Sequence, residues 1–233
     1  MKIYLVNQIL PGEYVDILNR YGKCMSLPSS ETIPPPVGRH PDTLVGKIGG
    51  EIFVGKRDGA LMAALDKEKI KYRVSSNDVS GVYPHDCSLN FFTAGRFLFG
   101  RTDSLSHEAL EYAVENGYTA VDVRQGYAHC SAALVGEGVI TADGGIFREL
   151  SRRGVPTLKI SDGSILLPPY EYGFIGGACA DIGDGNVIFF GSLNSHPDGE
   201  AIRGFCKKMG ARIIEGNGSL RDYGGIVTIY QQQ

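Results

Sequence analysis

One β-β-α-β pattern recurs through the sequence at intervals of roughly 45 residues, and this repeat constrains the fold more than any other feature. In each copy a short segment precedes a glycine turn and an apolar strand, as residues 40–45 precede 50–55 and residues 85–90 precede 95–100. Two further copies occupy 128–141 and 176–191. One equivalent position recurs in the four segments, where it is held by Asp42, Cys87, Cys130 and Cys179.

A helix and a further strand are expected after each hairpin. Apolar residues at helical spacing occur over 58–69, from 104 onward, over 143–153 and over 196–209. Short strand-like runs follow at 70–74, 119–123, 157–160 and 211–214. The alternative is a doubly wound α/β sheet, which needs one strand per helix. A hairpin before nearly every helix favours the repeated unit instead.

The two ends of the chain supply the parts of a fifth unit. Residues 221–230 are typical of its first strand, and residues 3–27 supply a strand, a helix over 11–21 and another strand. We expect the C-terminal strand to pair with the N-terminal one and close a ring, which would leave no open sheet edge there. The sequence therefore predicts an α/β fold, a pseudo-fivefold ββαβ propeller. It forms a single domain over 1–233, with units at about 40–75, 85–123, 127–160, 174–214, and 222–233 plus 1–27.

One segment does not fit the repeat. Residues 161–172, which contain Pro168 and Pro169, form an insertion between the third and fourth units. We expect a surface hairpin there, with a lid or rim loop as the alternative.

Composition narrows the classes of partner and compartment. A net charge of −3 implies no basic face, so nucleic acid is not expected as a partner. The apolar runs are far shorter than a membrane span, and the N-terminus lacks the features of a signal peptide. Five cysteines, an odd number, indicate free thiols in a reducing compartment, so we expect a cytoplasmic protein. No Cys-x-x-Cys, His-Glu-x-x-His or phosphate-loop pattern occurs, and we predict neither a metal nor a cofactor.

The repeat resembles the pentein superfamily of guanidino-modifying enzymes, which includes amidinotransferases, deiminases and dimethylarginine dimethylaminohydrolase. It looks closest to a small uncharacterised bacterial branch. The likeness is carried by residues 83–86, 125–130 and 172–177, and by the His-x-Asp-Thr element at 40–43. The resemblance implies a cysteine thiolate that attacks a guanidinium carbon, a histidine that acts as acid and base, and carboxylates that hold the cation. The implied ligand is a small cationic guanidino or amino-acid-like compound.

The sequence departs from this family at one point. The family nucleophile lies in the last unit, but this chain has no cysteine after Cys206 and carries Tyr223 to Val227 at that place. Two hypotheses therefore remain. The protein is an amidinohydrolase or amidinotransferase-like enzyme, or it is a non-catalytic ligand-binding or regulatory protein on a pentein scaffold.

The candidate thiols and imidazoles cluster in the recurring segments. Cys130 is the first candidate nucleophile, with His85 of the preceding unit as its acid and base. Cys87 is the second, with His40 as its acid and base. Either cysteine has the alternative of filling core space as a small buried residue. The remaining three, which we expect to be structural, are Cys24, Cys179 and Cys206.

Carboxylates in the same segments are the candidates for holding a cation. They are Asp42, Asp86 and Asp222, and His129 is added to them as a substrate-binding residue. The alternative for each aspartate is a turn residue that caps its own backbone, which is the favoured interpretation for Asp181.

Overall fold

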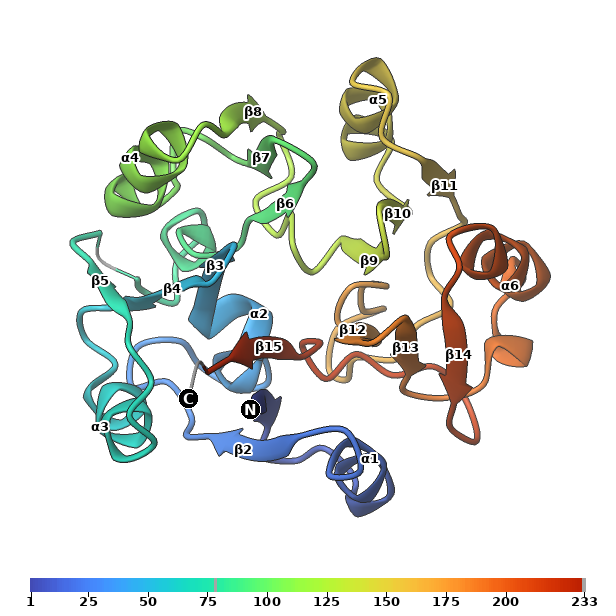
Figure 1. Cartoon of the computed structure of the whole chain (residues 1–233), viewed down its shortest axis with the longest axis horizontal. Coiled ribbons are helices and arrows are strands. Elements are labelled where there is room, and N and C mark those ends of the chain that lie inside the picture. The colour runs from blue at the N-terminus through green and yellow to red at the C-terminus, as the bar shows by residue number, and fades with distance from the viewer. Residues whose placement is uncertain (78, 232–233) are drawn as a thin grey trace.

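The computed structural model describes residues 1–77 and 79–231. Within these ranges the chain forms five three-stranded β-sheets, each accompanied by one α-helix (Figure 1). The sheets are separate in their hydrogen bonding, which excludes the single continuous sheet of a doubly wound fold. The predicted α/β class with a repeated three-stranded unit is confirmed.

Four of the sheets are each made from one continuous segment, in the order hairpin, helix, parallel strand. The first of these segments contains β3 (Val45–Ile48), β4 (Glu51–Gly55), α3 (Gly59–Lys67) and β5 (Arg73–Ser75), and the second contains β6 (Phe92–Ala94), β7 (Phe97–Gly100), α4 (His107–Glu115) and β8 (Thr119–Asp122). The third contains β9 (Ala132–Val135), β10 (Gly138–Thr141), α5 (Gly144–Arg152) and β11 (Thr157–Lys159), and the fourth contains β12 (Cys179–Gly183), β13 (Asn186–Phe189), α6 (Gly199–Lys208) and β14 (Arg212–Glu215). In every one, the middle strand pairs antiparallel with the first and parallel with the last.

The fifth sheet is assembled from both ends of the chain. It contains β15 (Val227–Tyr230), β1 (Lys2–Asn7) and β2 (Lys23–Leu27), and its helix is α1 (Gly12–Leu18). β1 pairs antiparallel with β15, with Lys2 opposite Tyr230, and parallel with β2, with Ile3 opposite Lys23. The expected pairing of the two terminal strands is therefore present. The last two residues of the predicted unit 222–233 lie outside the described residues.

The helices are short and begin and end at identifiable residues. Ser106 Oγ accepts a hydrogen bond from Ala109 N at the start of α4, and Asp143 Oδ1 accepts one from Ile146 N at the start of α5. A glycine in the left-handed region follows α4, α5 and α6 and turns the chain back toward its sheet, at Gly117, Gly154 and Gly210. No helix in the described part of the chain is long and apolar enough to cross a membrane.

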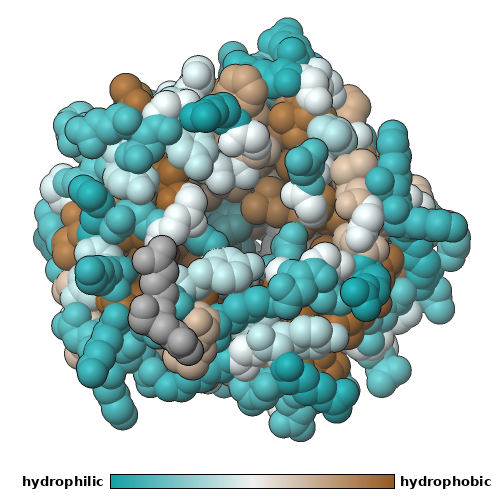
Figure 2. All heavy atoms as spheres, viewed as in Figure 1, coloured by the Kyte–Doolittle hydropathy of each residue, from teal (hydrophilic) through white to brown (hydrophobic). Residues whose placement is uncertain are grey.

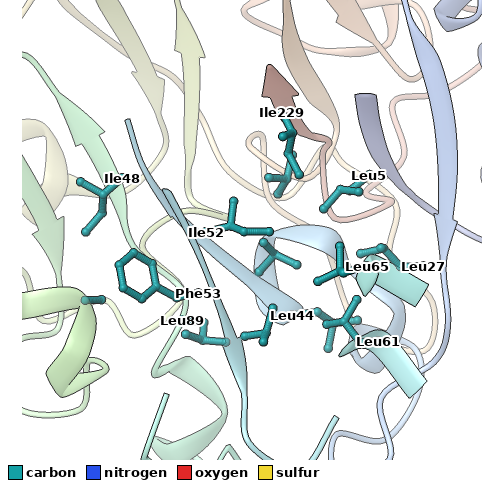
Figure 3. Packing of buried hydrophobic residues seen from close by; sticks show 14 of the residues in the cluster. Leu5, Leu27, Leu44, Ile48, Ile52, Phe53, Leu61, Leu65, Leu89 and Ile229 are labelled. Atoms are coloured by element: carbon teal, nitrogen blue, oxygen red, sulfur yellow. The ribbon is translucent and has the colours of Figure 1, made fainter. Parts of the chain in front are cut away.

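The hydrophobic core lies between neighbouring sheets as well as under each helix. Figure 3 shows one cluster in which Leu65 of α3 lies near Leu27 of β2, while Ile229 of β15 and Ile52 of β4 extend the same cluster. Residues from both chain ends thus share a core with the first repeated unit. Because burial of apolar surface is the main favourable term in folding, this shared core joins the terminal sheet to its neighbour.

The first strands of the units lie nearest the centre of the molecule (Figure 1). β12 contacts both β9 and β15, and β3 contacts β6. Polar residues cover most of the face shown in Figure 2, and the surface is hollowed near its centre. The inner positions of the first strands are therefore where residues from different units meet.

Two of the recurring segments that we expected at strand starts form single helical turns instead. They are α2 (Pro41–Leu44) before β3 and the 3-10 helix η2 (His85–Cys87) before β6. In α2, the backbone N–H groups of Thr43 and Leu44 both donate to the His40 carbonyl oxygen. Two further 3-10 turns are η1 (Val37–Arg39) and η3 (Leu193–Ser195).

The insertion at 161–172 does not form the expected hairpin. Leu166 makes an isolated parallel bridge with Arg221, in which Leu166 N donates to Leu220 O and Asp222 N donates to Leu166 O, both at 2.9 Å. The insertion is a loop that is fastened to the segment leading into β15.

Candidate active site

A cavity of about 290 Å³ lies beside the recurring segments of three units. Its polar lining includes His40, Cys130 and Asp222, from the first, third and fifth units. The rest of the lining is mainly aromatic and aliphatic: Val37, Tyr127, Leu167, Tyr170, Glu171, Tyr172 and Phe174. A small cavity with apolar walls and a few converging polar groups is typical of a small-molecule site.

The imidazole of His40 lies between two carboxylates. Its Nδ1 is 3.6 Å from Asp222 Oδ1 and 4.0 Å from Asp42 Oδ1. All three side chains are nearly fully buried, with at most 4% of the residue exposed. A buried histidine next to two aspartates forms a compact group for holding and moving protons.

Local backbone structure holds Asp222 in place. Its Oδ2 accepts a hydrogen bond of 2.8 Å from Phe174 N, and its Oδ1 accepts one of 2.9 Å from Gly224 N. A Cβ at Gly177 would lie 1.9 Å from Asp222 Oδ1, and a Cβ at Gly224 would lie 2.3 Å from His40 Cβ. Only glycine fits at these two positions, because the carboxylate and the imidazole occupy the space of a side chain.

Burial shifts the acid–base balance of both aspartates. It raises the pKa of Asp42 to about 6, with Asp222 adding to the rise and His40 opposing it. Burial also raises the pKa of Asp222, against the opposing effects of His40 and of the two backbone N–H donors. Asp42 Oδ2 is buried without a hydrogen-bond partner among the described residues. A positive charge placed here would stabilise both carboxylates in their ionised form.

Cys130 is positioned by a residue of the preceding unit. Asn90 is fully buried, and its Nδ2 donates to Cys130 Sγ and to the Asp42 carbonyl oxygen, both at 3.0 Å. Its Oδ1 accepts hydrogen bonds from His129 N at 2.7 Å and Cys130 N at 3.2 Å. One amide side chain therefore connects the first, second and third units at the thiol.

The pKa of the Cys130 thiol is well above its ordinary value. Burial is the largest cause, the negative charges of Asp42 and Asp222 come next, and the hydrogen bond from Asn90 acts in the opposite direction. Burial and the two carboxylates therefore favour the neutral thiol over the thiolate. A bound cation would counter the two carboxylates and favour the thiolate.

The second candidate thiol lies in a closed environment. Cys87 Sγ is 3.3 Å from Asp86 Oδ1, and Tyr127 OH donates a hydrogen bond to Asp86 Oδ2. Cys87 has no exposed area and does not line the cavity, and burial followed by the charge of Asp86 raises the pKa of its thiol. Asp86 thus engages Tyr127, whose ring forms part of the cavity wall.

The other predicted histidines lie elsewhere. His85 is exposed in η2, and among the described residues no hydrogen bond joins it to Cys130. His129 lines a larger cavity of about 460 Å³, together with residues from the first strands of all five units. Burial, with a smaller effect of Lys47, lowers the pKa of His129 to about 4. The imidazole that shares a cavity with Cys130 is His40.

Asn90 and the wall residues were not singled out as site residues in the sequence. Asn90 lies in the same recurring segment as Cys87, three residues after it, and position within the repeat is the only signal that points to it. Tyr170 and Glu171 belong to the insertion, for which a lid or rim loop is the alternative interpretation, but the repeat does not indicate which of its residues line the cavity. Among the described residues, no group of three or more His, Cys, Asp or Glu side chains is arranged to hold a metal ion.

A protein-family model described as "Family of unknown function (DUF6873)" matches residues 5–227 of the sequence. The chain belongs to this family. The match begins in β1 and ends in β15, so it includes residues of all five sheets of this DUF6873 member. No curated protein is matched by the sequence.

Three solved structures with a similar fold are an agmatine deiminase, a DDAH and an amidinotransferase. Agmatine deiminase of C. jejuni is similar with a TM-score of 0.60 at 11% identity, over 98% of this chain and 93% of the deiminase. DDAH from Pseudomonas aeruginosa, complexed with citrulline, has a TM-score of 0.51 at 12% identity, over 88% and 79%. The amidinotransferase SxtG of Microseira wollei, from saxitoxin biosynthesis, has a TM-score of 0.53 at 13% identity, over 88% and 73%. The predicted pentein resemblance is confirmed at the level of the fold.

Proposed function

We propose that this DUF6873 protein is a cysteine-dependent enzyme that acts on a C–N bond of a small guanidino compound. The observation that carries the proposal is that His40, Cys130 and Asp222 line one small cavity. The shared fold with guanidino-modifying enzymes supports the substrate class. In this assignment Cys130 is the nucleophile, His40 is the acid and base, and Asp222 with Asp42 orients the cation.

Electrostatics favour a cationic ligand at this place. Asp42 and Asp222 are both buried, and burial raises the pKa of each carboxyl group. A guanidinium beside them would stabilise their ionised forms in place of the lost solvent. The same charge lowers the pKa of the Cys130 thiol, so the nucleophile becomes active only when the substrate is bound.

The first half of the reaction forms a covalent adduct. The Cys130 sulfur adds to the guanidinium carbon while His40 takes the thiol proton, so a C–S bond forms and one C–N π bond becomes a nitrogen lone pair. His40 then gives this proton to the departing nitrogen. The C–N bond breaks, and an S-amidino adduct and a free amine or ammonia remain.

The second half releases the thiol. Water adds to the amidino carbon while His40 takes one of its protons, and the C–S bond breaks with return of that proton to the sulfur. The product is a urea. With an amine in place of water, the amidino group is transferred instead, and the same residues serve both outcomes.

Cys130 is preferred to Cys87 because only Cys130 lines the cavity. The resemblance to penteins implies a nucleophile in the last unit, and here that unit supplies Asp222. The thiol instead comes from the third unit.

We also propose that the five sheets form one closed ring within a single domain, because β15 pairs with β1. We further propose that the protein is cytoplasmic, because all five cysteines are free.

Labelling with 2-chloroacetamidine tests the proposal. We expect one covalent adduct, located on Cys130 by peptide mass spectrometry. The rate should exceed that of neutral 2-chloroacetamide after each is normalised to its rate with free cysteine, because only the amidine is cationic. Cys130→Ser should lose the adduct, and Cys87→Ser should keep it. Equal normalised rates, together with no turnover of any guanidine tried, would overturn the enzyme assignment.

A non-catalytic ligand-binding protein is the second candidate. The raised pKa of Cys130 favours it, because a neutral thiol is a poor nucleophile. Stabilisation of the protein by guanidino compounds without labelling or turnover would support this alternative.

A further inference from the structure

Among the residues that the structure describes, the lining of the Cys130 cavity contains carboxylates but no lysine or arginine. We infer that the site takes a guanidino compound that carries no carboxylate group, such as an alkylguanidine or an aminoalkylguanidine. This inference rests on the proposed function and narrows its substrate class.

Negative charge is present at both the bottom and the rim of the cavity. Asp222 is 4% exposed and lies beside His40, which also neighbours Asp42. Asp42 Oδ2 is buried with no hydrogen-bond partner in the described part of the chain, and the Asp42 carboxylate interacts with the Cys130 thiol. Glu171 belongs to the insertion, is exposed at the rim, and forms no ion pair with any described residue.

A ligand carboxylate would find no counter-charge here. Proteins usually bind carboxylates through arginine, which offers two parallel donors. Two nearby arginines have partners outside the cavity: Arg39 Nε donates to Ser29 Oγ, and Arg101 pairs with Asp103 and donates to Tyr83 OH. Arg221 is exposed and is not among the residues that line the cavity. Among the described lining residues, an amino-acid carboxylate would therefore face Glu171 and Asp222 with no lysine or arginine to compensate.

The aromatic side chains that line the Cys130 cavity can pack against the uncharged part of such a ligand. The rings of Tyr127 and Phe174 lie 6.3 Å apart at 30°, and Tyr170 and Tyr172 stand at the rim. Aromatic faces attract guanidinium and ammonium groups and also pack against methylene chains. A guanidinium at Asp222 with a short apolar chain would contact these rings. A terminal ammonium on that chain would pair with Glu171.

Three compounds that share a guanidine and a four-carbon chain or its equivalent test the inference. Agmatine ends in an ammonium, butylguanidine ends in a methyl group, and arginine adds a carboxylate. Their affinities are measured by calorimetry on Cys130→Ser and by thermal shift on the unmodified protein. We expect agmatine and butylguanidine to bind, and arginine to bind at least about tenfold more weakly than agmatine because of like-charge repulsion.

The outcomes separate the two proposals. If arginine binds as tightly as agmatine or more tightly, the inference is overturned while the guanidine assignment survives. If none of the three binds either protein, the proposed function itself fails.

Glu171→Gln gives a second readout at an exposed position, where a folding defect is not expected. Agmatine should lose affinity several-fold, and butylguanidine should not. The matched control is Glu115→Gln at the exposed end of α4, which should change neither. Unchanged agmatine affinity in Glu171→Gln would contradict the role of Glu171.

Discussion

The side-chain amide of Asn90 donates a hydrogen bond of 3.0 Å to the sulfur of Cys130, forty residues later in the chain. The same side chain contacts Asp42 O and the backbone N–H groups of His129 and Cys130. Asn90 therefore holds the first, second and third units together and also holds the Cys130 thiol in position.

Asn90→Leu should destabilise the fold, because leucine has a similar size but leaves buried backbone groups without partners. We expect the free energy of unfolding to fall by about 3 kcal/mol, measured by urea denaturation. Asn217→Leu at an exposed loop position is the control and should change it by less than about 0.5 kcal/mol. Equal effects of the two substitutions would contradict the positioning role of Asn90.

Gly177→Ala should impair the site more than the fold. The added Cβ would lie 1.9 Å from Asp222 Oδ1, so the carboxylate must move away from its two backbone donors. The labelling rate of Cys130 by 2-chloroacetamidine should fall by about tenfold or more. The matched control is Gly204→Ala in α6, where nothing lies within 4 Å of the new Cβ and the labelling rate should not change. A Gly177→Ala protein that is labelled at the normal rate would contradict this account of Asp222.

Asp42 should make the protein less stable as pH rises. Its folded-state pKa of about 6 lies above its ordinary value of 3.8, so between these values the folded protein binds more protons than the unfolded chain. The stability that this group contributes is present below pH 4 and is lost as pH rises through 6. The unfolding free energy of the natural protein minus that of Asp42→Asn should therefore fall from pH 4 to pH 6. A flat difference would contradict the raised pKa.

His129 should act in the opposite direction over nearly the same range. Its folded-state pKa of about 4 lies below the ordinary 6.5, so the unfolded chain binds more protons between these values. The unfolding free energy of the natural protein minus that of His129→Gln should rise from pH 4 to pH 6.5. The contributions of Asp42 and His129 have opposite signs over nearly the same pH range. The unfolding free energy of the natural protein alone would therefore not separate them, and the two variants are needed.

The core shared by the terminal sheet and the first repeated unit should be sensitive to cavities. Leu65 has no exposed area and lies in the cluster of Figure 3 with Leu27 and Ile229. Leu65→Ala should lower the unfolding free energy by about 2–5 kcal/mol. Val114→Ala, at a position that is 66% exposed on α4, should change it by less than about 0.5 kcal/mol. If the loss at Leu65 were as small as that at Val114, the two sheets would not share a core.

The sequence by itself determined the repeated unit and the origin of the fifth sheet. Hairpins, amphipathic helices and glycine turns are local patterns that can be identified from sequence. Because the same pattern occurs four times at one spacing, each copy supports the assignment of the others. The pairing of β15 with β1 followed because the two chain ends carry complementary parts of the same unit. These features need no knowledge of which side chains meet.

Only the tertiary structure decided which residues share a site. His40, Cys130 and Asp222 come from three units and line one cavity, and His40 directly precedes the helical turn α2. The sequence paired Cys130 with His85 of the adjacent unit, but the structure places His40 at the same cavity and leaves His85 exposed. The contacts of Asn90 and the position of Glu171 at this cavity likewise come from the tertiary structure, although the sequence allows a rim loop as one interpretation of the insertion. Contacts between distant segments depend on how whole units pack, and no local pattern along the chain records that packing.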